Sequence, residues 1–270
     1  MKKLDFKPGR TLICGIVNIT PDSFSDGGKW LSKEAALAHA LELEAHGADM
    51  LDIGGESSRP GSLPVGLEEE KRRVLPVLEA LAGRVKVPVS VDTCKPELAA
   101  LAVKAGADYI NDITGFTSPS MIGAAGGSGA GAIVMHMKGE PRTMQEAPVY
   151  KDVVAEVKDF LAGRVAALRA AGVAEIMVDP GIGFGKTLEH NLALLARLGE
   201  LGELGCPVFL GVSRKKFIGA LAGGEPGDRL AGTIAACVQG AAAGAAVLRV
   251  HDVADCRRAM LVADAIRAAR

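Results

Sequence analysis

Met177-Val-Asp-Pro-Gly-Ile-Gly-Phe-Gly-Lys186 is the stretch that decides the fold. The apolar residues before Asp179 predict a buried strand, because Pro180 and the glycines after it prevent a regular element from continuing. Asp179 therefore stands at the carboxyl end of a strand, which is where parallel α/β proteins hold their ligands. The alternative is a tight turn into the next helix, in which Asp179 only caps that helix.

The glycine loop matches neither of the common nucleotide-binding motifs. Gly181 and the pair Gly185-Lys186 are separated by fewer residues than a P-loop needs, and the sequence contains no glycine-x-glycine-x-x-glycine run. The acid and the glycines therefore indicate a ligand site of another kind.

Length and composition suggest one large α/β barrel. The chain has 270 residues, and a (β/α)8 barrel typically has about 250. Hydrophobic residues make up 49% but aromatic ones only 4%, so we expect a core of Ala, Val, Leu and Ile. The formal charge of −1 gives no general attraction to nucleic acid or to a membrane surface. The 5 cysteines have no paired spacing, which argues against a disulfide framework and fits a cytoplasmic protein.

Extended apolar segments alternate with longer helical ones along the whole chain. We expect strands at 11–17, 50–53, 88–91, 109–110, 132–135, 176–178, 208–211 and 247–250. This alternation predicts a parallel sheet. Glycines that would end a helix in a left-handed C-cap precede several strands, at Gly47, Gly106, Gly172 and Gly244. Because no linker divides the sequence, we predict an α/β fold, a (β/α)8 TIM barrel formed by residues 1–270 as a single domain.

Polar side chains follow almost every predicted strand. The carboxyl ends of parallel strands meet at one rim, so these residues should converge: Asn18, Ser58, Arg59, Asp92, Asn111, His136, Asp179, Ser213, Lys215, Arg249 and His251. A helix cap or a solvated loop would explain any single one of them. Together they predict a polar mouth, and the long connections 18–29, 54–66 and 136–148 resemble lids over it.

The polar residues of this rim differ in chemistry. Acceptors that suit the N–H edge of a flat nitrogen heterocycle come from Asp92, Asn111 and Asp179. Groups that suit a phosphate or diphosphate come from Asn18, Ser58, Arg249 and His251. Lys215 could serve either ligand or belong to a solvated basic run. No Ser-His-Asp or Cys-His arrangement can be assigned, so we do not expect a covalent mechanism.

Several runs of the sequence resemble the dihydropteroate synthase family. The resemblance lies in Asn18–Gly28, Asp52–Gly61, Ser90–Thr93, Asn111–Gly115, Met135–Met137, Ser213–Gly219 and Arg249–Val253. These runs extend in order from the first strand to the last, and the first two are specific to this enzyme among pterin-binding barrels. One departure is Ser58, where the family often has threonine.

The resemblance implies an enzyme of folate biosynthesis. It would condense 6-hydroxymethyl-7,8-dihydropterin diphosphate with 4-aminobenzoate to give 7,8-dihydropteroate and diphosphate, by loss of diphosphate and attack of the amine on a pterin methylene cation. The resemblance also implies that sulfonamides compete with 4-aminobenzoate and that the protein is a homodimer. From the formal charge we expect neither a nucleic-acid nor a membrane partner.

The resemblance further implies a role for each residue of the rim. Pterin contacts would come from Asp92, Asn111, Met135, Asp179 and Lys215, with Asp92, Asp179 and Lys215 as the catalytic residues. Diphosphate contacts would come from Asn18, Ser58, Arg249 and His251, and Asn18 would also hold Mg²⁺. The wall around aminobenzoate would consist of Phe24, Ser58, Arg59, Pro60, Phe184, Ser213 and Lys215.

Two other functions are compatible with a pterin-binding barrel. A methyltransferase acting with a corrinoid partner would share the pterin acids but would not explain the first two long loops. A binding or assembly protein could keep the pocket without turnover. The Ala- and Gly-rich segment Ala231–Ala246 could pack on a second copy or on its own barrel.

Overall fold

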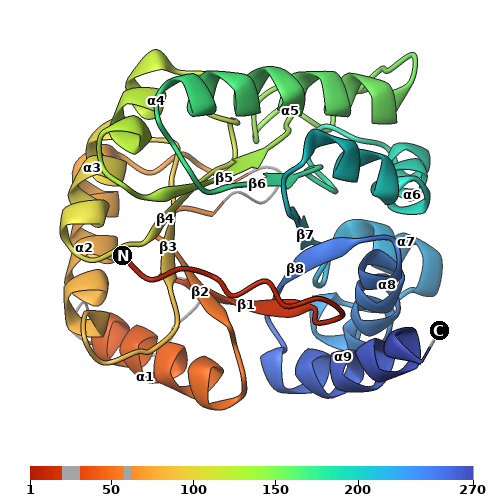
Figure 1. The fold of residues 1–270 in the computed structure, drawn as a ribbon, viewed down its shortest axis with the longest axis horizontal. Helices are drawn as coiled ribbons and strands as arrows, with labels where there is room; N and C mark the ends of the chain where they lie inside the picture. Colours follow the sequence, from red (N-terminus) through yellow and green to blue (C-terminus); the bar gives the residue numbers. More distant parts are fainter. Residues whose placement is uncertain (20–30, 58–61, 270) are drawn as a thin grey trace.

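A closed ring of parallel strands forms the centre of the structure, a computed structural model that describes residues 1–19, 31–57 and 62–269. Strand order follows chain order, and β8 pairs with β1 to close the ring (Figure 1). The strands are β1 (Leu12–Asn18), β2 (Met50–Gly54), β3 (Val89–Asp92), β4 (Tyr109–Asp112), β5 (Gly131–Met135), β6 (Ile176–Asp179), β7 (Val208–Gly211) and β8 (Ala245–Val250). The predicted (β/α)8 barrel is confirmed, and every predicted strand overlaps an observed one.

Helices cover the outside of the barrel (Figure 1). They are α1 (Leu31–Ala45), α2 (Leu67–Leu81), α3 (Pro96–Lys104), α4 (Pro119–Gly126), α5 (Val153–Ala170), α6 (Leu188–Ala196), α7 (Lys216–Ala222), α8 (Leu230–Ala242) and α9 (Val253–Ala268), with 3₁₀ segments at Leu198–Leu204 and Pro226–Asp228. The predicted helix stops are confirmed, because Gly47, Gly106, Gly172 and Gly244 have φ values of 94°, 111°, 86° and 104°. These angles favour glycine, which lacks a β-carbon.

Inward-facing side chains form layers inside the barrel. The lower part of the barrel interior is apolar and consists of Leu12, Cys14, Met50, Tyr109, Ile133, Met177, Phe209 and Val247. Because side chains alternate along a strand, the next inward position lies two residues further on. Those positions hold Asp52, Asn111, Met135, Asp179 and Arg249. The polar mouth is therefore the last inward layer of the barrel, and its residues lie within the strands rather than after them.

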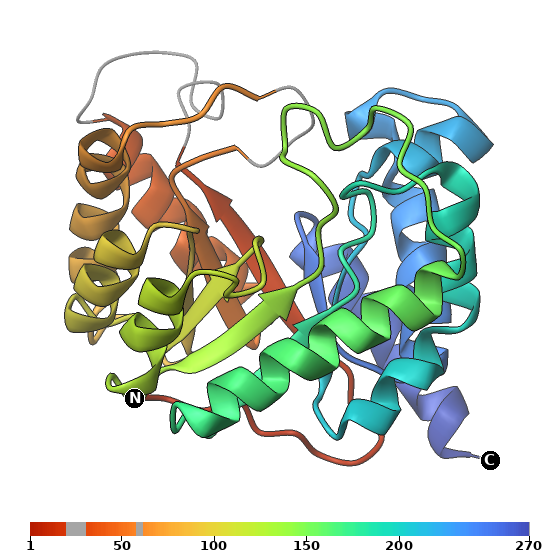
Figure 2. The same ribbon diagram turned by 90° about the horizontal axis from the view of Figure 1, so that it is seen from above.

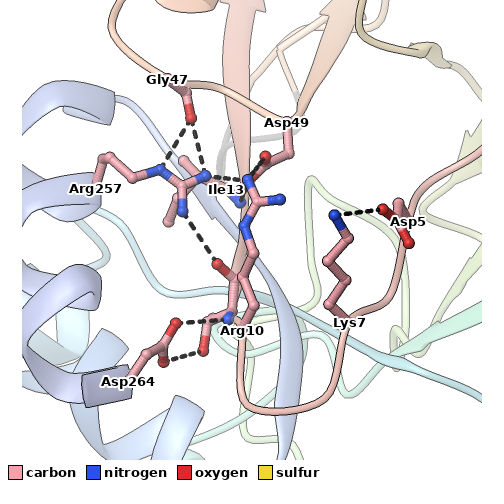
Figure 3. Close-up of polar contacts among 9 residues, drawn as sticks. Asp5, Lys7, Arg10, Ile13, Gly47, Asp49, Arg257 and Asp264 are labelled. Atoms are coloured by element: carbon pink, nitrogen blue, oxygen red, sulfur yellow. Dashed lines mark hydrogen bonds and ion pairs between the residues drawn. The ribbon is translucent and has the colours of Figure 1, made fainter. Parts of the chain in front are cut away.

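Ion pairs and hydrogen bonds close the opposite end of the barrel. Arg257 of α9 donates to Gly47 O at 2.9 and 3.1 Å and also contacts the carboxylate of Asp49 (Figure 3). Asp264, from the same helix, accepts from the backbone N–H of Thr11 at 2.7 Å. The last helix is thus tied to the first strand. Both chain ends lie on this side, and the connection that follows β5 rises on the other (Figure 2).

Candidate active site

The predicted pterin residues lie side by side at the carboxyl ends of neighbouring strands. Asp92 of β3 pairs in register with Asn111 of β4, and Met135 of β5 pairs with Asp179 of β6. Asn111, Met135 and Asp179 are each only 5% exposed. The structure therefore brings these residues together in one layer, with their polar atoms largely shielded from water.

Asp52, which the sequence pattern did not single out, organises this layer. Its carboxylate is fully buried and accepts from Ser90 Oγ, from Asn111 Nδ2 at 3.1 Å and from Arg249 Nε at 2.6 Å. Arg249 Nη2 also donates to Asp92 at 3.0 Å. Arg249, which is predicted to bind diphosphate, thus lies directly beside Asp92, which is predicted to bind pterin.

Burial and neighbouring charges shift the pKa values in this layer. Burial raises the pKa of Asp92, the Asp52 carboxylate raises it further, and Arg249 opposes both. Burial also raises the pKa of Asp179, against the ammonium of Lys215. Burial disfavours the charged form of Arg249, but Asp52 and Asp92 outweigh it and raise the arginine pKa. Arg249 and Lys215 therefore only partly offset the effect of burial, and the protonated form of both acids is favoured relative to a carboxyl group in water.

Lys215 belongs to the mouth rather than to a solvated basic run. It immediately precedes α7, and its Nζ donates to Ile182 O and lies 4.9 Å from the centre of the Phe184 ring. Burial lowers the pKa of Lys215 to about 8, and the carboxylate of Asp179 opposes this shift. The lysine and the aromatic ring thus form one wall next to the acid.

Ser213 lies against His251. Ser213 Oγ is 3.0 Å from His251 Nδ1, and the His251 backbone N–H donates to the same oxygen at 3.2 Å. Arg214, which separates Ser213 from Lys215, has a left-handed φ of 58° and donates from Nε to Asp252 at 3.0 Å. This turn places Ser213 beside β8 and Lys215 beside β6. Ser213, which the sequence predicts to contact aminobenzoate, therefore also orients His251, which the sequence predicts to contact diphosphate.

The glycine loop after β6 fits closely against the connection after β5. A β-carbon would lie 1.9 Å from His136 O if placed on Gly181, and 2.1 Å from Lys138 O if placed on Gly185. Both glycines have left-handed φ values, 67° and 64°. Only glycine fits at these positions. The connection 136–148 is thus packed against the glycine loop at its start, rather than standing free as a lid.

Asn18 is the last residue of β1 and lies near Asp92. A β-carbon on Gly54 would be 3.8 Å from Asn18 Oδ1 and 3.8 Å from Asp92 Oδ2, so both oxygens border the space that this glycine leaves open. Within residues 1–19, 31–57 and 62–269, no group of three or more His, Cys, Asp or Glu is arranged to hold a metal. The other predicted residues, Phe24, Ser58, Arg59 and Pro60, lie outside the described part of the chain.

Comparison with known proteins places the chain in a family. Residues 14–251 match the model of the pterin binding enzymes. The dihydropteroate synthase of Escherichia coli K12 is 46% identical over 260 residues, covering 96% of this chain and 92% of that protein. This chain belongs to the dihydropteroate synthase family.

Solved structures of this family share the fold. The Yersinia pestis dihydropteroate synthase, in a complex with a sulfonamide drug, has a TM-score of 0.91 and 43% identity, covering 96% of this chain and 95% of that one. The Xanthomonas albilineans dihydropteroate synthase with 4-aminobenzoic acid has a TM-score of 0.90 and 49% identity, covering 96% and 94%. The resemblance found in the sequence motifs is confirmed over nearly the whole chain.

Proposed function

We propose that this chain condenses 6-hydroxymethyl-7,8-dihydropterin diphosphate with 4-aminobenzoate, giving 7,8-dihydropteroate and diphosphate in folate biosynthesis. Membership of the family supports this reaction. The observation that carries it is the layer in which Asp92, Asn111 and Asp179 lie beside Arg249. One mouth thereby offers acceptors for a heterocycle next to a cation for a diphosphate. The identity to a dihydropteroate synthase favours this reaction over methyl transfer to a corrinoid partner.

The pterin would lie across the layer formed by β3 to β6. Asp92, Asn111 and Asp179 would accept from its N–H groups, because carboxyl and amide oxygens can each accept more than one hydrogen bond. Met135 would pack on the face of the ring, since it lies in register with Asp179 and is almost fully buried. Lys215 would donate to a ring acceptor from the side of the glycine loop.

The diphosphate would lie on the side of β8 and β1. Arg249 supports this role by its planar set of donors, and His251 by its place just beyond the same strand. The bond between Ser213 and Nδ1 fixes the orientation of the histidine ring. Asn18 would hold Mg²⁺, which prefers oxygen ligands and combines one or two protein groups with substrate phosphates. When bound, Mg²⁺ would neutralise charge on the leaving diphosphate.

The reaction requires no nucleophile from the protein. The C–O bond between the pterin methylene and the diphosphate breaks, and its electron pair leaves with the diphosphate, whose charge Arg249 and His251 stabilise. The remaining cation is delocalised into the pterin ring, where Asp92 and Asp179 stabilise it. The amine of 4-aminobenzoate then forms the C–N bond and loses a proton, for which the released diphosphate can serve as the acceptor.

The aminobenzoate would lie against the wall formed by Phe184 and Lys215. Ser213 would help to hold its carboxylate, and Phe24, Ser58, Arg59 and Pro60 would complete the wall from the first two long loops. A sulfonamide presents a similar aniline, so it should compete with 4-aminobenzoate for this place. The sulfonamide complex of the Yersinia pestis relative supports this expectation.

We further propose a cytoplasmic homodimer that pairs through an apolar groove between α6, α7 and α8. The groove is lined by Leu192, Leu195, Phe217, Leu221 and Ala235, among others. Leu221 is 59% exposed there. Leu221→Glu should convert a dimer to a monomer in light scattering, whereas Leu261→Glu on α9 should not.

All 5 cysteines are free thiols, which supports the proposed cytoplasmic location, because the cytoplasm is a reducing compartment. Among the described residues, no helix combines the length and apolar character needed to cross a bilayer.

The reaction is tested by supplying both substrates with Mg²⁺ and measuring diphosphate and 7,8-dihydropteroate. We expect the two products in equal amounts, and neither 7,8-dihydropteroate nor steady diphosphate release when 4-aminobenzoate is omitted. A chain that binds both substrates without forming either product would be a binding protein. A chain that instead moves a methyl group from a methylated pterin would be a methyltransferase.

A further inference from the structure

A buried lysine lies behind the glycine loop, outside the residues assigned above. Lys186 is only 2% exposed, and its Nζ lies 2.9 Å from Phe184 O, 3.3 Å from His136 O and 2.9 Å from His136 Nδ1. Phe184 belongs to the loop after β6, whereas His136 directly follows β5. Lys186 therefore joins the segments that follow two neighbouring strands, β5 and β6.

Burying the Lys186 amine costs free energy, because the amine loses its hydration and only its hydrogen bonds compensate for that loss. Lys186 forms no ion pair with a carboxylate among the described residues. Burial lowers the pKa of Lys186 well below its usual value, although Asp179 opposes the shift, and burial together with Lys186 lowers the pKa of His136 to about 3. Methionine would fill the same space without this cost. The hydrogen bonds are therefore what the lysine adds.

These bonds persist whichever proton arrangement the pair adopts. The carbonyl oxygens of His136 and Phe184 can only accept, so Nζ donates to both. The third bond either runs from Nζ to the lone pair of His136 Nδ1 or from Nδ1–H to the lone pair of a neutral amine. Both arrangements keep Lys186 bonded to the same atoms.

The loop that carries Phe184 depends on such bonds along its whole length. Each carbonyl group from Gly181 to Gly185 accepts a hydrogen bond. In chain order, the donors to these five carbonyls are Phe184 N–H, Lys215 Nζ, Gln145 Nε2, Lys186 Nζ and Tyr150 O–H. Asp179 is held differently, because it lies in β6 and its carbonyl accepts from His136 N at 3.0 Å. The sheet thus holds the backbone of Asp179, and its carboxylate also accepts from the Gly181 N–H at 2.7 Å at the start of the loop. The Phe184 carbonyl lies further along the loop, where Lys186 is its donor.

We propose that Lys186 is a positioning residue for the aminobenzoate half of the site. It holds the main chain of Phe184, and through it the ring that lies next to Lys215. It does not contact substrate itself. The inference rests on the proposed function, because it assigns Phe184 to the aminobenzoate wall. Loss of Lys186 should therefore weaken use of 4-aminobenzoate while pterin binding, which relies on Asp179, stays intact.

The test compares Lys186→Met with the unchanged protein. The KM for 4-aminobenzoate and the inhibition constant of a sulfonamide should both rise about 10- to 100-fold, the range that follows from leaving a buried acceptor unpaired. The Kd of the free pterin, measured by calorimetry, should change less than about 2-fold. Hydrogen exchange should become faster in residues 182–185 and not in β6.

Two further sets of variants separate positioning from a general loss of stability. His136→Asn keeps an acceptor near the place of Nδ1 and should behave almost like the unchanged protein, whereas His136→Leu should raise the KM as Lys186→Met does. Tyr109→Phe is the matched control at the other end of the barrel, where the hydroxyl bonds Glu175 and Leu4. It should lower the melting temperature without changing the KM. The His136 pair decides the question if Lys186→Met does not fold.

Several results would overturn the inference. An unchanged KM in an active, folded Lys186→Met protein would show that Phe184 is held without the lysine. Equal losses of aminobenzoate and pterin binding, or a similar rise in KM for Tyr109→Phe, would show a general structural role. If the unchanged protein forms no product from both substrates, the proposed function itself fails. Hydrogen exchange would then still decide whether Lys186 fixes the loop.

Discussion

Arg249 Nε donates to the buried carboxylate of Asp52 at 2.6 Å, so the cation proposed for diphosphate is fixed by a residue two strands away around the barrel. The same guanidinium reaches Asp92 through Nη2. The positions proposed for pterin and for diphosphate are therefore connected through one side chain. A pterin that bonds Asp92 would draw the acid away from Arg249 and release guanidinium donors toward the diphosphate.

Arg249→Ala should separate the two ligands. Diphosphate affinity should fall, because a charged donor is lost. Free pterin should bind about as well as before, because the contacts proposed for Asn111, Met135, Asp179 and Lys215 remain. Calorimetry with each ligand alone checks this expectation. Equal losses for both ligands would contradict the division of the mouth into two halves.

The same substitution should also make stability depend on pH. Without Arg249, the carboxylates of Asp52 and Asp92 lack their shared cation, and breaking such a pair costs about 3–5 kcal/mol. The pKa of Asp92 is already raised in the folded protein and should rise further. The destabilisation should therefore be present above that pKa and shrink as pH falls through it, when Asp92 takes up a proton. Melting temperatures measured from below to above pH 8, the approximate pKa of Asp92, provide the measurement, with Arg249→Lys as the control.

Asp179→Asn should weaken pterin binding without unfolding the protein. The amide replaces one acceptor oxygen by a donor, which would face a pterin N–H, so affinity should fall about 10- to 100-fold. Burial raises the pKa of Asp179, which means that its charged form is disfavoured in the fold. The melting temperature at neutral pH should therefore stay the same or rise. Undiminished pterin binding in the folded variant would remove Asp179 from the site.

Lys215 should set the alkaline limit of activity. Its pKa is lowered to about 8, so the ammonium loses its proton as pH rises through that value. The kcat/KM for the pterin diphosphate should then decline with an apparent pKa near 8, because this ratio reports groups of the free enzyme. A decline that begins only near the usual lysine value would show that this amine is not required in its charged form.

Arg59→Ala should act on the amine substrate alone. Arg59 lies outside the described residues, and its role is carried by the sequence motif only. The KM for 4-aminobenzoate should rise and the overall rate should fall, with little change in pterin Kd. A loss of about 1 kcal/mol in the binding free energy of 4-aminobenzoate would indicate that Arg59 contacts its carboxylate in the presence of water. A larger loss would indicate that this carboxylate is desolvated. Abolished pterin binding with an unaltered KM would show that the loop was assigned to the wrong half.

The rim of the site was predictable because parallel strands bring their carboxyl ends together. Side-chain alternation then decides which residue at a strand end faces the mouth. Asp92 and Asp179 do so, whereas Asp112, the last residue of β4, accepts from backbone N–H groups of the following turn. The strand ends themselves were placed too early in several cases. Asn111 disfavours a strand by propensity, but pairing with β3 and β5 keeps it in β4.

Other parts of the site depend on contacts that sequence spacing does not reveal. Asp52 lies within a buried strand, and only the alternation from Met50 marks it as an inward residue of the polar layer. Its partner Arg249 is far away in sequence. Lys186 follows a glycine loop and shows no pattern of its own, because its acceptors belong to Phe184 and to another strand end. Such pairs become visible only once the barrel has closed.

The closure of the barrel base also decides how this enzyme can be joined to other molecules. Arg257 and Asp264 hold the last helix against the first strand, and both chain ends lie on the side away from the substrate entrance (Figures 2 and 3). A partner domain fused at either end, or a surface to which the protein is tethered, would therefore leave the entrance open. Gene fusion could place a neighbouring enzyme beside this one without obstructing the exchange of substrates.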